Sequence, residues 1–339
     1  MRELITSAQN PKIKELLALQ EKSRLRRKEG LFVLEGRREL ERCVAAGMKV
    51  RTVFVCPEIF GLAENDAGPL ALSGVPKNVP PGGKKPEIPA GGSENVPPDR
   101  MALGDGSSAT PILPTSWVPS LFGSQSRLSR TANPETTPEA GTAVFEVSAA
   151  VYEKIAYRGG TEGVMAIVET PELGLERLNL PEKPLVVVLE AVEKPGNLGA
   201  VLRSADAAGA DAVIVCDPLA DVFNPNVIRA STGAVFSVPV AVASSEEAID
   251  FLKKNNIRIL TAQLQDSVLY YDSDMKKGTA IVMGTEDKGL SELWREAADE
   301  HIRIPMLGVA DSLNVSVSAA ILLFEAVRQR RGDARSGRA

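Results

Sequence analysis

The stretch PLVVVLEAVEKPGNLGAVLRSADAAGADAVIVC, residues 184–216, decides the fold. It opens with an apolar run at 184–192, which is typical of a strand that is buried on both faces. Residues 197–210 then show the apolar spacing of a helix that ends near Gly209. A second apolar run follows at 211–216. A strand, a helix and a strand in this order predict a parallel β-α-β unit.

The same alternation continues toward the end of the chain. We expect further strands at 235–240, 257–262 and 279–284, with helices around 224–232, at 244–255, at 290–299 and at 314–331. Alternating strands and helices predict an α/β fold, a parallel sheet with helices on both faces. In such sheets, ligands bind at the carboxyl ends of the strands.

Three polar loops contain glycine, of which two follow predicted strands and the third precedes the last predicted helix, and we expect all three to lie at this edge. They span residues 190–209, 282–291 and 302–320, and their notable residues are Asn197, Gly199, Arg203, Gly284, Glu286, Gly289, Ser312 and Asn314. Any one of these loops is explained equally well as a tight connection between a strand and a helix. The three together predict a polar ligand site at the strand ends.

Several common cofactor and catalytic patterns are absent from the sequence. Gly196-x-x-Gly199 is not the dinucleotide fingerprint G-x-G-x-x-G, and there is no P-loop. His301 is the one histidine, which excludes HExxH zinc chemistry. The three cysteines stand far apart, so we expect neither a disulfide scaffold nor a Cys-rich zinc site. No metal is expected.

The N-terminal part predicts a second, smaller α/β domain. We expect helices at 10–28, 37–47 and 148–157, and strands at 31–36, 50–56, 143–148 and 163–169. Residues 1–56 together with 143–170 would form this domain, and residues 184–331 the larger one. Residues 332–339 are expected to be a disordered tail.

Residues 57–142 differ in composition from everything around them. They hold 14 of the 23 prolines and 11 of the 28 glycines. A proline and glycine content this high, without apolar periodicity, is typical of disordered chain. We therefore expect a disordered insertion that loops out of the small domain.

Charge is distributed unevenly along the chain. The whole chain has a formal net charge of −5, yet residues 1–56 carry 13 Lys+Arg against 7 Asp+Glu. The basic residues gather in Lys22, Arg24, Arg26, Arg27 and Lys28, which predicts either a surface for a polyanion or a solvated helix end. No apolar run is long enough to span a membrane and the first thirty residues lack the apolar core of a secretory signal, so we expect a cytoplasmic protein.

Taken together, the three loops resemble the three motifs of the SpoU/TrmH family of RNA 2′-O-ribose methyltransferases, part of the SPOUT superfamily. The residues that carry the resemblance are Asn197-x-Gly199-x-x-x-Arg203, Met283-Gly284-Thr285-Glu286-x-x-Gly289, Ile304-Pro305-Met306 and Ser312-Leu313-Asn314-Val315-Ser316. RASTGAVFSVPV (229–240) is similar to a further family stretch. The N-terminal part resembles the substrate-binding domain of the ribosomal-RNA branch. Lys194, Ser318 and the insertion depart from the usual pattern.

The resemblance implies a deep trefoil knot in the C-terminal part, S-adenosylmethionine (SAM) as cofactor and a homodimer. The residues that it implies as cofactor contacts are Gly284, Ile304, Leu313, Thr261 and Met306. It implies Arg203 as the catalytic centre, assisted by Asn197, Glu286, Ser312 and Asn314. Because arginine stays charged in proteins, Arg203 either activates the hydroxyl or holds the adjacent phosphate and orients it. The expected RNA-binding residues are Lys22, Arg24, Arg26, Arg27, Lys28, Arg37 and Arg38.

The expected function is therefore SAM-dependent methylation of a ribose 2′-hydroxyl in structured RNA. The two-domain layout favours 23S-type ribosomal RNA, and transfer RNA is the alternative substrate. A non-catalytic RNA-binding or ribosome-assembly protein of the same fold also stays open, although the intact polar motif residues argue against it. An enzyme acting on a small nucleotide is a further alternative, against which the basic N-terminal segment argues.

Overall fold

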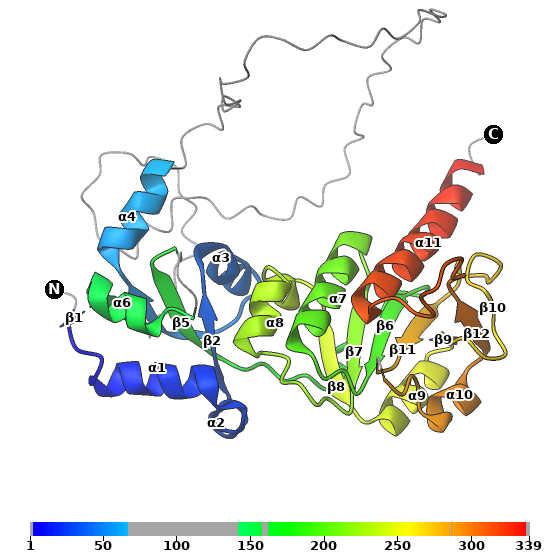
Figure 1. Ribbon diagram of the computed structural model, residues 1–339, viewed down its shortest axis with the longest axis horizontal. Coiled ribbons are helices and arrows are strands. Elements are labelled where there is room, and N and C mark those ends of the chain that lie inside the picture. The colour runs from blue at the N-terminus through cyan, green and yellow to red at the C-terminus, as the bar shows by residue number, and fades with distance from the viewer. Residues whose placement is uncertain (1–2, 67–141, 158–161, 286, 337–339) are drawn as a thin grey trace, which may run out of the picture.

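A computed structural model describes residues 3–66, 142–157, 162–285 and 287–336. These residues form two sheets that lie side by side, each covered by helices (Figure 1). The α/β class expected from the sequence is confirmed.

The larger sheet has seven parallel strands in the order β10-β12-β9-β11-β6-β7-β8. Its strands are β6 (Leu185–Glu190), β7 (Ala212–Cys216), β8 (Val240–Ala243), β9 (Arg258–Ala262), β10 (Val268–Leu269), β11 (Thr279–Met283) and β12 (Glu300–Arg303). Its helices are α7 (Pro195–Ala208), α8 (Pro225–Ala230), α9 (Ser245–Lys254), α10 (Glu292–Ala297) and α11 (Val315–Ser336).

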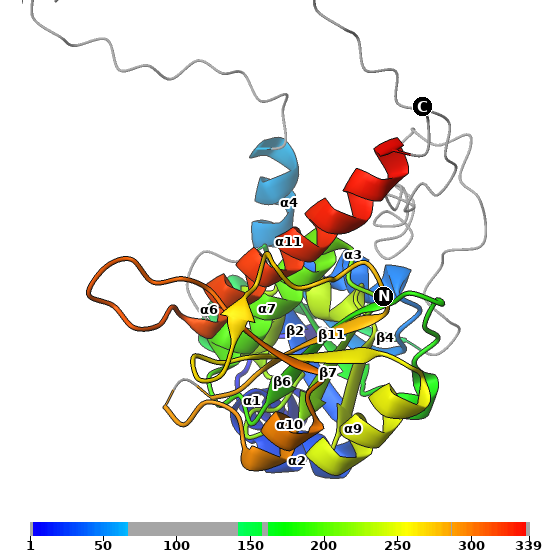
Figure 2. The same cartoon turned by 90° about the vertical axis from the view of Figure 1, so that its right-hand side faces the viewer.

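The central strand β6 is buried on both faces, as its apolar sequence predicts. Val187 and Leu189 pack into one core with apolar residues of α7 and α11, whereas Val186 and Val188 pack into another with residues of α9 and α10. Both views show α7 and α11 on one side of the sheet and α9 and α10 on the other (Figures 1 and 2). The side-chain period of two along a strand sends alternate residues to these two faces.

The smaller sheet is mixed, with the strand order β1-β4-β3-β5-β2. Its strands are β1 (Leu4–Ile5), β2 (Leu31–Glu35), β3 (Val50–Val55), β4 (Ala143–Val147) and β5 (Val164–Glu169), and the helices around it are α1 (Pro11–Glu21), α2 (Ser23–Glu29), α3 (Arg37–Ala45), α4 (Pro57–Asp66) and α6 (Ala149–Ile155). A 3-10 turn, η2 (Leu175–Arg177), lies between the sheets in sequence. One core is formed by residues of α1 and α6 against this sheet.

The two sheets share one apolar core at their junction. Phe32 of β2 stacks on Phe223 at 4.5 Å between ring centroids, and Phe236 lies 5.9 Å from Phe32. Stacked aromatic rings at these separations attract one another beyond the area that they bury. Strand β2 of the small sheet is therefore packed against α8 and the residues that flank it in the large domain.

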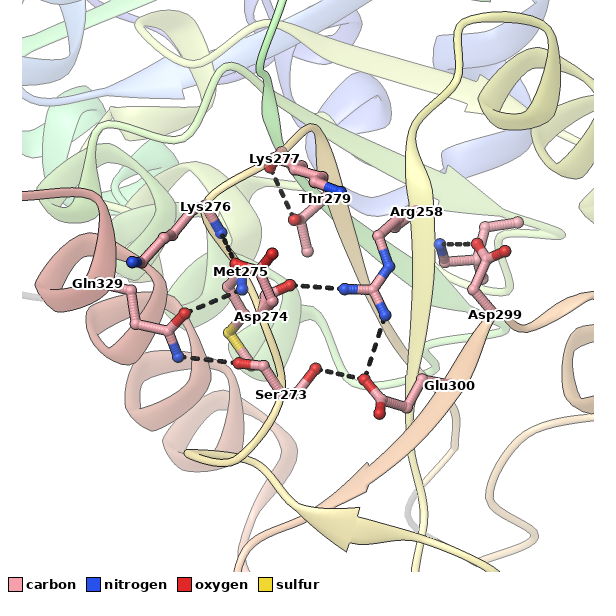
Figure 3. A network of polar contacts seen from close by, with 11 residues as sticks. Arg258, Ser273, Asp274, Met275, Lys276, Lys277, Thr279, Asp299, Glu300 and Gln329 are labelled. Carbon is pink, nitrogen blue, oxygen red and sulfur yellow. Dashed lines mark hydrogen bonds and ion pairs between the residues drawn. The ribbon is translucent and has the colours of Figure 1, made fainter. Parts of the chain in front are cut away.

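The C-terminal helix is tied to the segment that leads into β11. The side chain of Gln329 on α11 accepts from the Met275 amide at 2.9 Å and donates to the Ser273 carbonyl at 3.0 Å (Figure 3). The Arg330 guanidinium donates to four carbonyl oxygens, those of Met275, Lys277, Lys183 and Pro184. Arg258 extends the network with bonds to the Asp274 carbonyl and the Glu300 carboxylate.

Some expected elements are wrong in the large sheet. The strand expected at 235–240 is a 3-10 turn, η3 (Ala234–Phe236), followed by β8 at Val240. Gly233 has φ of 80°, and this left-handed residue turns the chain before a strand can begin. The expectation also missed β10, which is only two residues long, and β12, a short strand in which Glu300, His301 and Arg303 are charged or polar.

Other differences lie at the ends of the predicted segments. The helix expected at 10–28 is interrupted at Lys22, which has extended backbone angles. Residues 57–66, which we expected to be disordered, form helix α4, and residues 67–141 of the expected insertion lie outside the described residues. Helix α11 continues to Ser336, so residues 332–336 of the expected tail are helical.

Within the described part of the chain, no helix combines the length and the apolar content that a membrane span requires.

Candidate active site at the carboxyl edge of the large sheet

The three motif loops follow strands of the same parallel sheet. β6 leads into α7, β11 leads into the loop at 284–291, and β12 leads into the loop at 304–314. Because all three strands are parallel, their carboxyl ends lie at one edge. The topology therefore brings the three motifs to one region, as the sequence predicts.

The first motif lies at the start of α7. Pro195 occupies the first turn, where its missing N–H group costs no helix hydrogen bond, and Gly209 ends the helix with φ of 65°. A Cβ atom on Gly199 would lie 2.6 Å from the Cβ of Ala230 and 2.8 Å from the carbonyl oxygen of Val227. Gly199 is thus required for the close packing of α7 on α8, which gives this motif glycine a structural purpose.

Arg203 lies on α7, about two turns after its start. Its side chain is exposed, and among the described residues its guanidinium has neither a hydrogen bond nor an ion pair. Charged side chains that are not neutralised by the protein are available to a phosphate or a hydroxyl group. The position fits the role that the resemblance implies for this residue.

A direct hydrogen bond joins the first and third motifs. The Nδ2 group of Asn314 donates to Oδ1 of Asn197 at 3.2 Å, across 117 positions of sequence. The Oδ1 atom of Asn314 accepts from the amide of Ser316 at 3.0 Å, so the same side chain caps the start of α11. Asn314 therefore fixes α11 and presents an amide to α7 at the same time.

Other expected catalytic residues are not brought into this contact. Ser312 is exposed, and its hydroxyl donates weakly to the neighbouring Asp311 at 3.4 Å. Glu286 lies outside the described residues. The roles expected for these two residues stay predictions.

The second motif forms a tight loop. The amide of Thr285 donates to the carbonyl of Gly289 and the reverse bond is also present, both at 3.1 Å. A Cβ atom on Gly284 would lie 2.2 Å from the carbonyl oxygen of Gly289. Only glycine fits at position 284, and the backbone of the loop folds back onto it.

The expected cofactor contacts differ in accessibility. Ile304 and Met306 are half-buried, and Leu313 is exposed. Thr261 is fully buried in β9, with its hydroxyl 2.6 Å from Nδ1 of His301. The side chain of Thr261 is thus engaged by the one histidine of the chain, a contact that sequence spacing did not predict.

Cys216 ends β7 beside Glu190, and it is buried. Burial, reinforced by the nearby charges of Asp217 and Glu190, raises the pKa of this thiol far above its ordinary value. The thiol therefore stays protonated at neutral pH and supplies no thiolate nucleophile at this edge.

The structure separates the expected RNA-binding residues into two groups. Lys22, Arg24, Arg27, Lys28 and Arg38 are exposed, and Arg37 is half-buried over the ring of Phe60. Arg26 is 3% exposed, with its Nε 2.6 Å from Asp221 and its Nη1 bonded to two carbonyl oxygens of α1. The assignment of Arg26 to RNA docking is wrong, because its guanidinium is enclosed by the protein.

A model of the SpoU rRNA Methylase family matches residues 184–324, and a model described as an MRM3-like substrate binding domain matches residues 10–77. A 23S rRNA (uridine(2479)-2′-O)-methyltransferase of Streptomyces viridochromogenes is 39% identical over 49% of this chain and 60% of its own length, somewhat less than two thirds. A 23S rRNA (guanosine-2′-O-)-methyltransferase of Bordetella pertussis is 38% identical over 58% of this chain and 83% of its own length.

Among solved structures, an AdoMet-bound rRNA methyltransferase from Sinorhizobium meliloti superposes with a TM-score of 0.69. It is 26% identical, and the match covers 96% of this chain and 97% of that one. The fold, the three motif loops and these relatives agree, and the chain belongs to the SpoU rRNA methylase family.

Proposed function

We propose that this protein transfers a methyl group from SAM to a ribose 2′-hydroxyl of ribosomal RNA, with 23S-type RNA as the substrate. The observation that carries the proposal is the hydrogen bond between Asn197 and Asn314, which joins the first and third motifs beside the helix of Arg203. The names of the relatives, which are 23S rRNA 2′-O-methyltransferases, support the same activity.

The residues at the strand ends fit SAM as the cofactor. Ile304 and Met306 are half-buried apolar residues that we propose as contacts of the adenine ring, and Leu313 lies exposed on the same loop. The backbone of the tight loop at Gly284 offers main-chain groups for the polar parts of the molecule. When bound, SAM supplies an electrophilic methyl group on a positively charged sulfur. We propose Gly284, Ile304, Met306 and Leu313 as contacts, with Thr261 contributing through its backbone.

Arg203 is the residue that we place next to the reacting ribose. Because its guanidinium is permanently charged, it holds the neighbouring phosphate and orients the 2′-hydroxyl instead of accepting the proton itself. The 2′-oxygen would take the methyl group as its bond to sulfur breaks, S-adenosylhomocysteine would leave, and the hydroxyl proton would pass to water. We propose that the amide groups of Asn197 and Asn314 fix the geometry around it, and that Glu286 and Ser312 assist Arg203 as the family resemblance implies. Positioning of this kind can supply about 7–11 kcal/mol of barrier reduction at its best.

The substrate RNA is proposed to dock on exposed basic residues of helices α2 and α3, which lie on opposite faces of the small sheet, because Leu25 of α2 and Leu40 of α3 pack into different cores. Lys22, Arg24, Arg27 and Lys28 lie on or next to α2, with Arg37 and Arg38 at the start of α3. Phosphate contacts of this kind position an RNA and make its affinity dependent on salt. Residues 1–56 together with 143–170 are proposed as the RNA-binding domain, and residues 184–331 as the methyltransferase domain.

We also propose a homodimer, a cytoplasmic location and the trefoil knot. Leu307 and Val309 are almost fully exposed, at 97% and 106%, and Val317 and Phe324 on α11 are about half exposed. Large apolar side chains exposed to this degree favour a protein partner, and we propose that a second copy covers them. The knot is implied by the family resemblance, and α11 packed across residues 273–277 is compatible with it.

The proposal is tested with tritiated SAM and total RNA that is separated by size after the reaction. We expect label in large ribosomal RNA with the wild type, and a loss of at least about 100-fold with Arg203→Ala, because misplacing a reacting group costs rates of this order. Arg203→Lys tests whether charge alone suffices, and Arg177→Ala removes an exposed arginine of the η2 turn as a control.

Three other outcomes of this experiment would overturn the proposed substrate, the proposed activity or the proposed role of Arg203. Label in transfer RNA would retain the activity and overturn the substrate. RNA binding without methyl transfer, on ribosomal precursors as well as mature RNA, would favour the non-catalytic alternative. Full activity of Arg203→Ala would refute the role of that residue.

A further inference from the structure

Glu190 is a buried carboxylate at the carboxyl end of β6, and none of the three motifs includes it. It is 8% exposed and lies in the middle of the large sheet, with Cys216 of β7 as its register partner. A charged group in such a place is costly unless it is hydrogen-bonded. The hydrogen bond that the Glu190 carboxylate makes indicates its structural role.

The partner of Glu190 belongs to the second motif loop. One carboxylate oxygen accepts from the amide of Ser291 at 2.9 Å, across 101 positions of sequence. Ser291 is the residue before α10, and its own side chain makes no capping bond. Glu190 therefore satisfies a backbone donor at the point where the loop ends and the helix begins.

The bond between Glu190 and Ser291 adds to the contacts that hold the described residues of the second motif loop. One end continues directly from β11, and the middle is closed by the paired amide and carbonyl groups of Thr285 and Gly289. The amide of Lys288 also donates to the Thr285 hydroxyl at 3.0 Å. At the far end, the Glu190 bond is the contact that anchors Ser291 to the neighbouring strand β6.

We propose that Glu190 is a positioning residue for cofactor binding, which acts by holding the 284–291 loop against the edge of β6. The inference rests on the proposed function, because it takes Gly284 in this loop as a contact of SAM. A charge-assisted bond to a backbone amide is stronger than a neutral one, so the carboxylate is well suited to hold a loop whose backbone must fit a ligand. Its carboxylate does not itself touch the reacting atoms.

The test uses three variants of the full chain. Glu190→Ala removes the acceptor, and Glu190→Gln keeps an oxygen of the same reach without the charge. Asp211→Ala is the matched control: the Asp211 carboxylate accepts from the Leu185 amide at 2.7 Å, at the opposite end of the same strand. Each alanine variant loses one hydrogen bond between a carboxylate and a backbone amide at an end of β6. Only Glu190→Ala loses it at the carboxyl end of the strand, where the motif loops lie.

Two quantities are measured on each variant. The dissociation constant for SAM comes from calorimetry, and hydrogen exchange of the amides at 285–291 comes from the protein without ligand. We expect Glu190→Ala to weaken SAM binding by about tenfold, the change that corresponds to one lost charge-assisted hydrogen bond. Exchange at 285–291 should accelerate in the same variant. Glu190→Gln should stay within about threefold of the wild type, and Asp211→Ala should change neither quantity.

The outcomes separate this inference from the proposed function. Unchanged exchange at 285–291 in Glu190→Ala, or equal loss of SAM affinity in Asp211→Ala, would overturn the positioning role. A wild type that binds no SAM would overturn the proposed function, and the exchange measurement would then still decide whether Glu190 holds the loop.

Discussion

The guanidinium of Arg26 and the carboxylate of Asp221 meet at 2.6 Å, and they join the small sheet's helix α2 to the segment before α8. Their side chains are 3% and 12% exposed. Arg26 also donates to the carbonyls of Leu19 and Gln20, at 2.6 and 2.9 Å. The pair lies at the same junction as the stacked rings of Phe32 and Phe223, so the two sheets are joined by polar and apolar contacts together.

Removal of one member of this pair should destabilise the protein. We expect Asp221→Asn to lower the free energy of unfolding by about 3 kcal/mol, because a buried guanidinium would lose its counter-charge. The double variant Arg26→Met, Asp221→Leu should recover most of that loss, since apolar replacements leave no buried charge. Urea denaturation measures both. Lys28→Ala, which removes an exposed pair with Glu29, should change stability by less than about 0.5 kcal/mol. A double variant no more stable than Asp221→Asn would contradict the expectation.

The contact between Asn197 and Asn314 should matter for turnover more than for folding. Asn314→Asp keeps the oxygen that caps α11 but replaces the donor to Asn197 with a carboxylate oxygen. We expect stability to stay within about 0.5 kcal/mol, because aspartate is an equally good N-cap, and kcat to fall at least about tenfold. The control is Asn224→Asp, since Asn224 caps α8 through the same kind of bond to Asn226. Equal kcat values for Asn314→Asp and Asn224→Asp would show that the hydrogen bond between Asn197 and Asn314 does not contribute to catalysis.

Two glycines of α7 should respond in opposite ways to alanine. Gly199→Ala would push a methyl group against Ala230 and Val227, and we expect a loss of about 1–3 kcal/mol of stability. Gly196→Ala meets nothing within 4 Å, so its higher helix propensity should leave stability equal or raised by up to about 1 kcal/mol. Thermal and urea unfolding of the two variants give the comparison. Equal destabilisation would mean that the packing of α7 on α8 does not require position 199 to be glycine.

Burial of Cys43 should make stability depend on alkaline pH. Burial raises the pKa of this thiol from an ordinary value near 9 to about 12. Between these values the unfolded chain releases the proton and the folded chain retains it, so stability falls as pH rises above about 9. The slope from one such group is at most about 1.4 kcal/mol per pH unit. Cys43→Ala should therefore lose less stability than the wild type between pH 8 and pH 10.5 in urea denaturation. Parallel losses would contradict the shift.

The central β-α-β unit is the part of the fold that sequence predicts best, because β6 and β7 are uninterrupted apolar runs and α7 has a proline at its start and a glycine after its end. β12 was missed because Glu300 and His301 occupy half of its four residues. Its place in the sheet comes from pairing with β9, which is a tertiary contact. The interruption at Lys22 likewise depends on packing that a local apolar pattern does not encode.

The candidate site could be proposed from the sequence to the extent that its motifs are local. Asn197 and Arg203 stood out because they follow a strand and lie in the first two turns of a helix, and the roles proposed for them come from the family resemblance. Glu190 was missed, although an acidic residue at the end of the run LVVVLE was a usable signal, since a buried strand rarely ends in a charge without a partner. The burial of Arg26 could not be found in the same way, because its partner Asp221 is 195 positions away.

The bonds of Arg330 to Lys183 and Pro184 have a consequence for protein synthesis. The carbonyl of Pro184 accepts from the Thr279 amide, and its second donor, Arg330, is made 146 residues after it. At about 5–20 residues per second, roughly 7–30 s separate the translation of these two residues. During that interval the strands of the large sheet are made, the last of them β12, but the face that α11 covers is not yet closed, so this core is complete only when translation has passed α11. A cell that slows translation would therefore prolong the time in which this sheet is open to solvent and to chaperones.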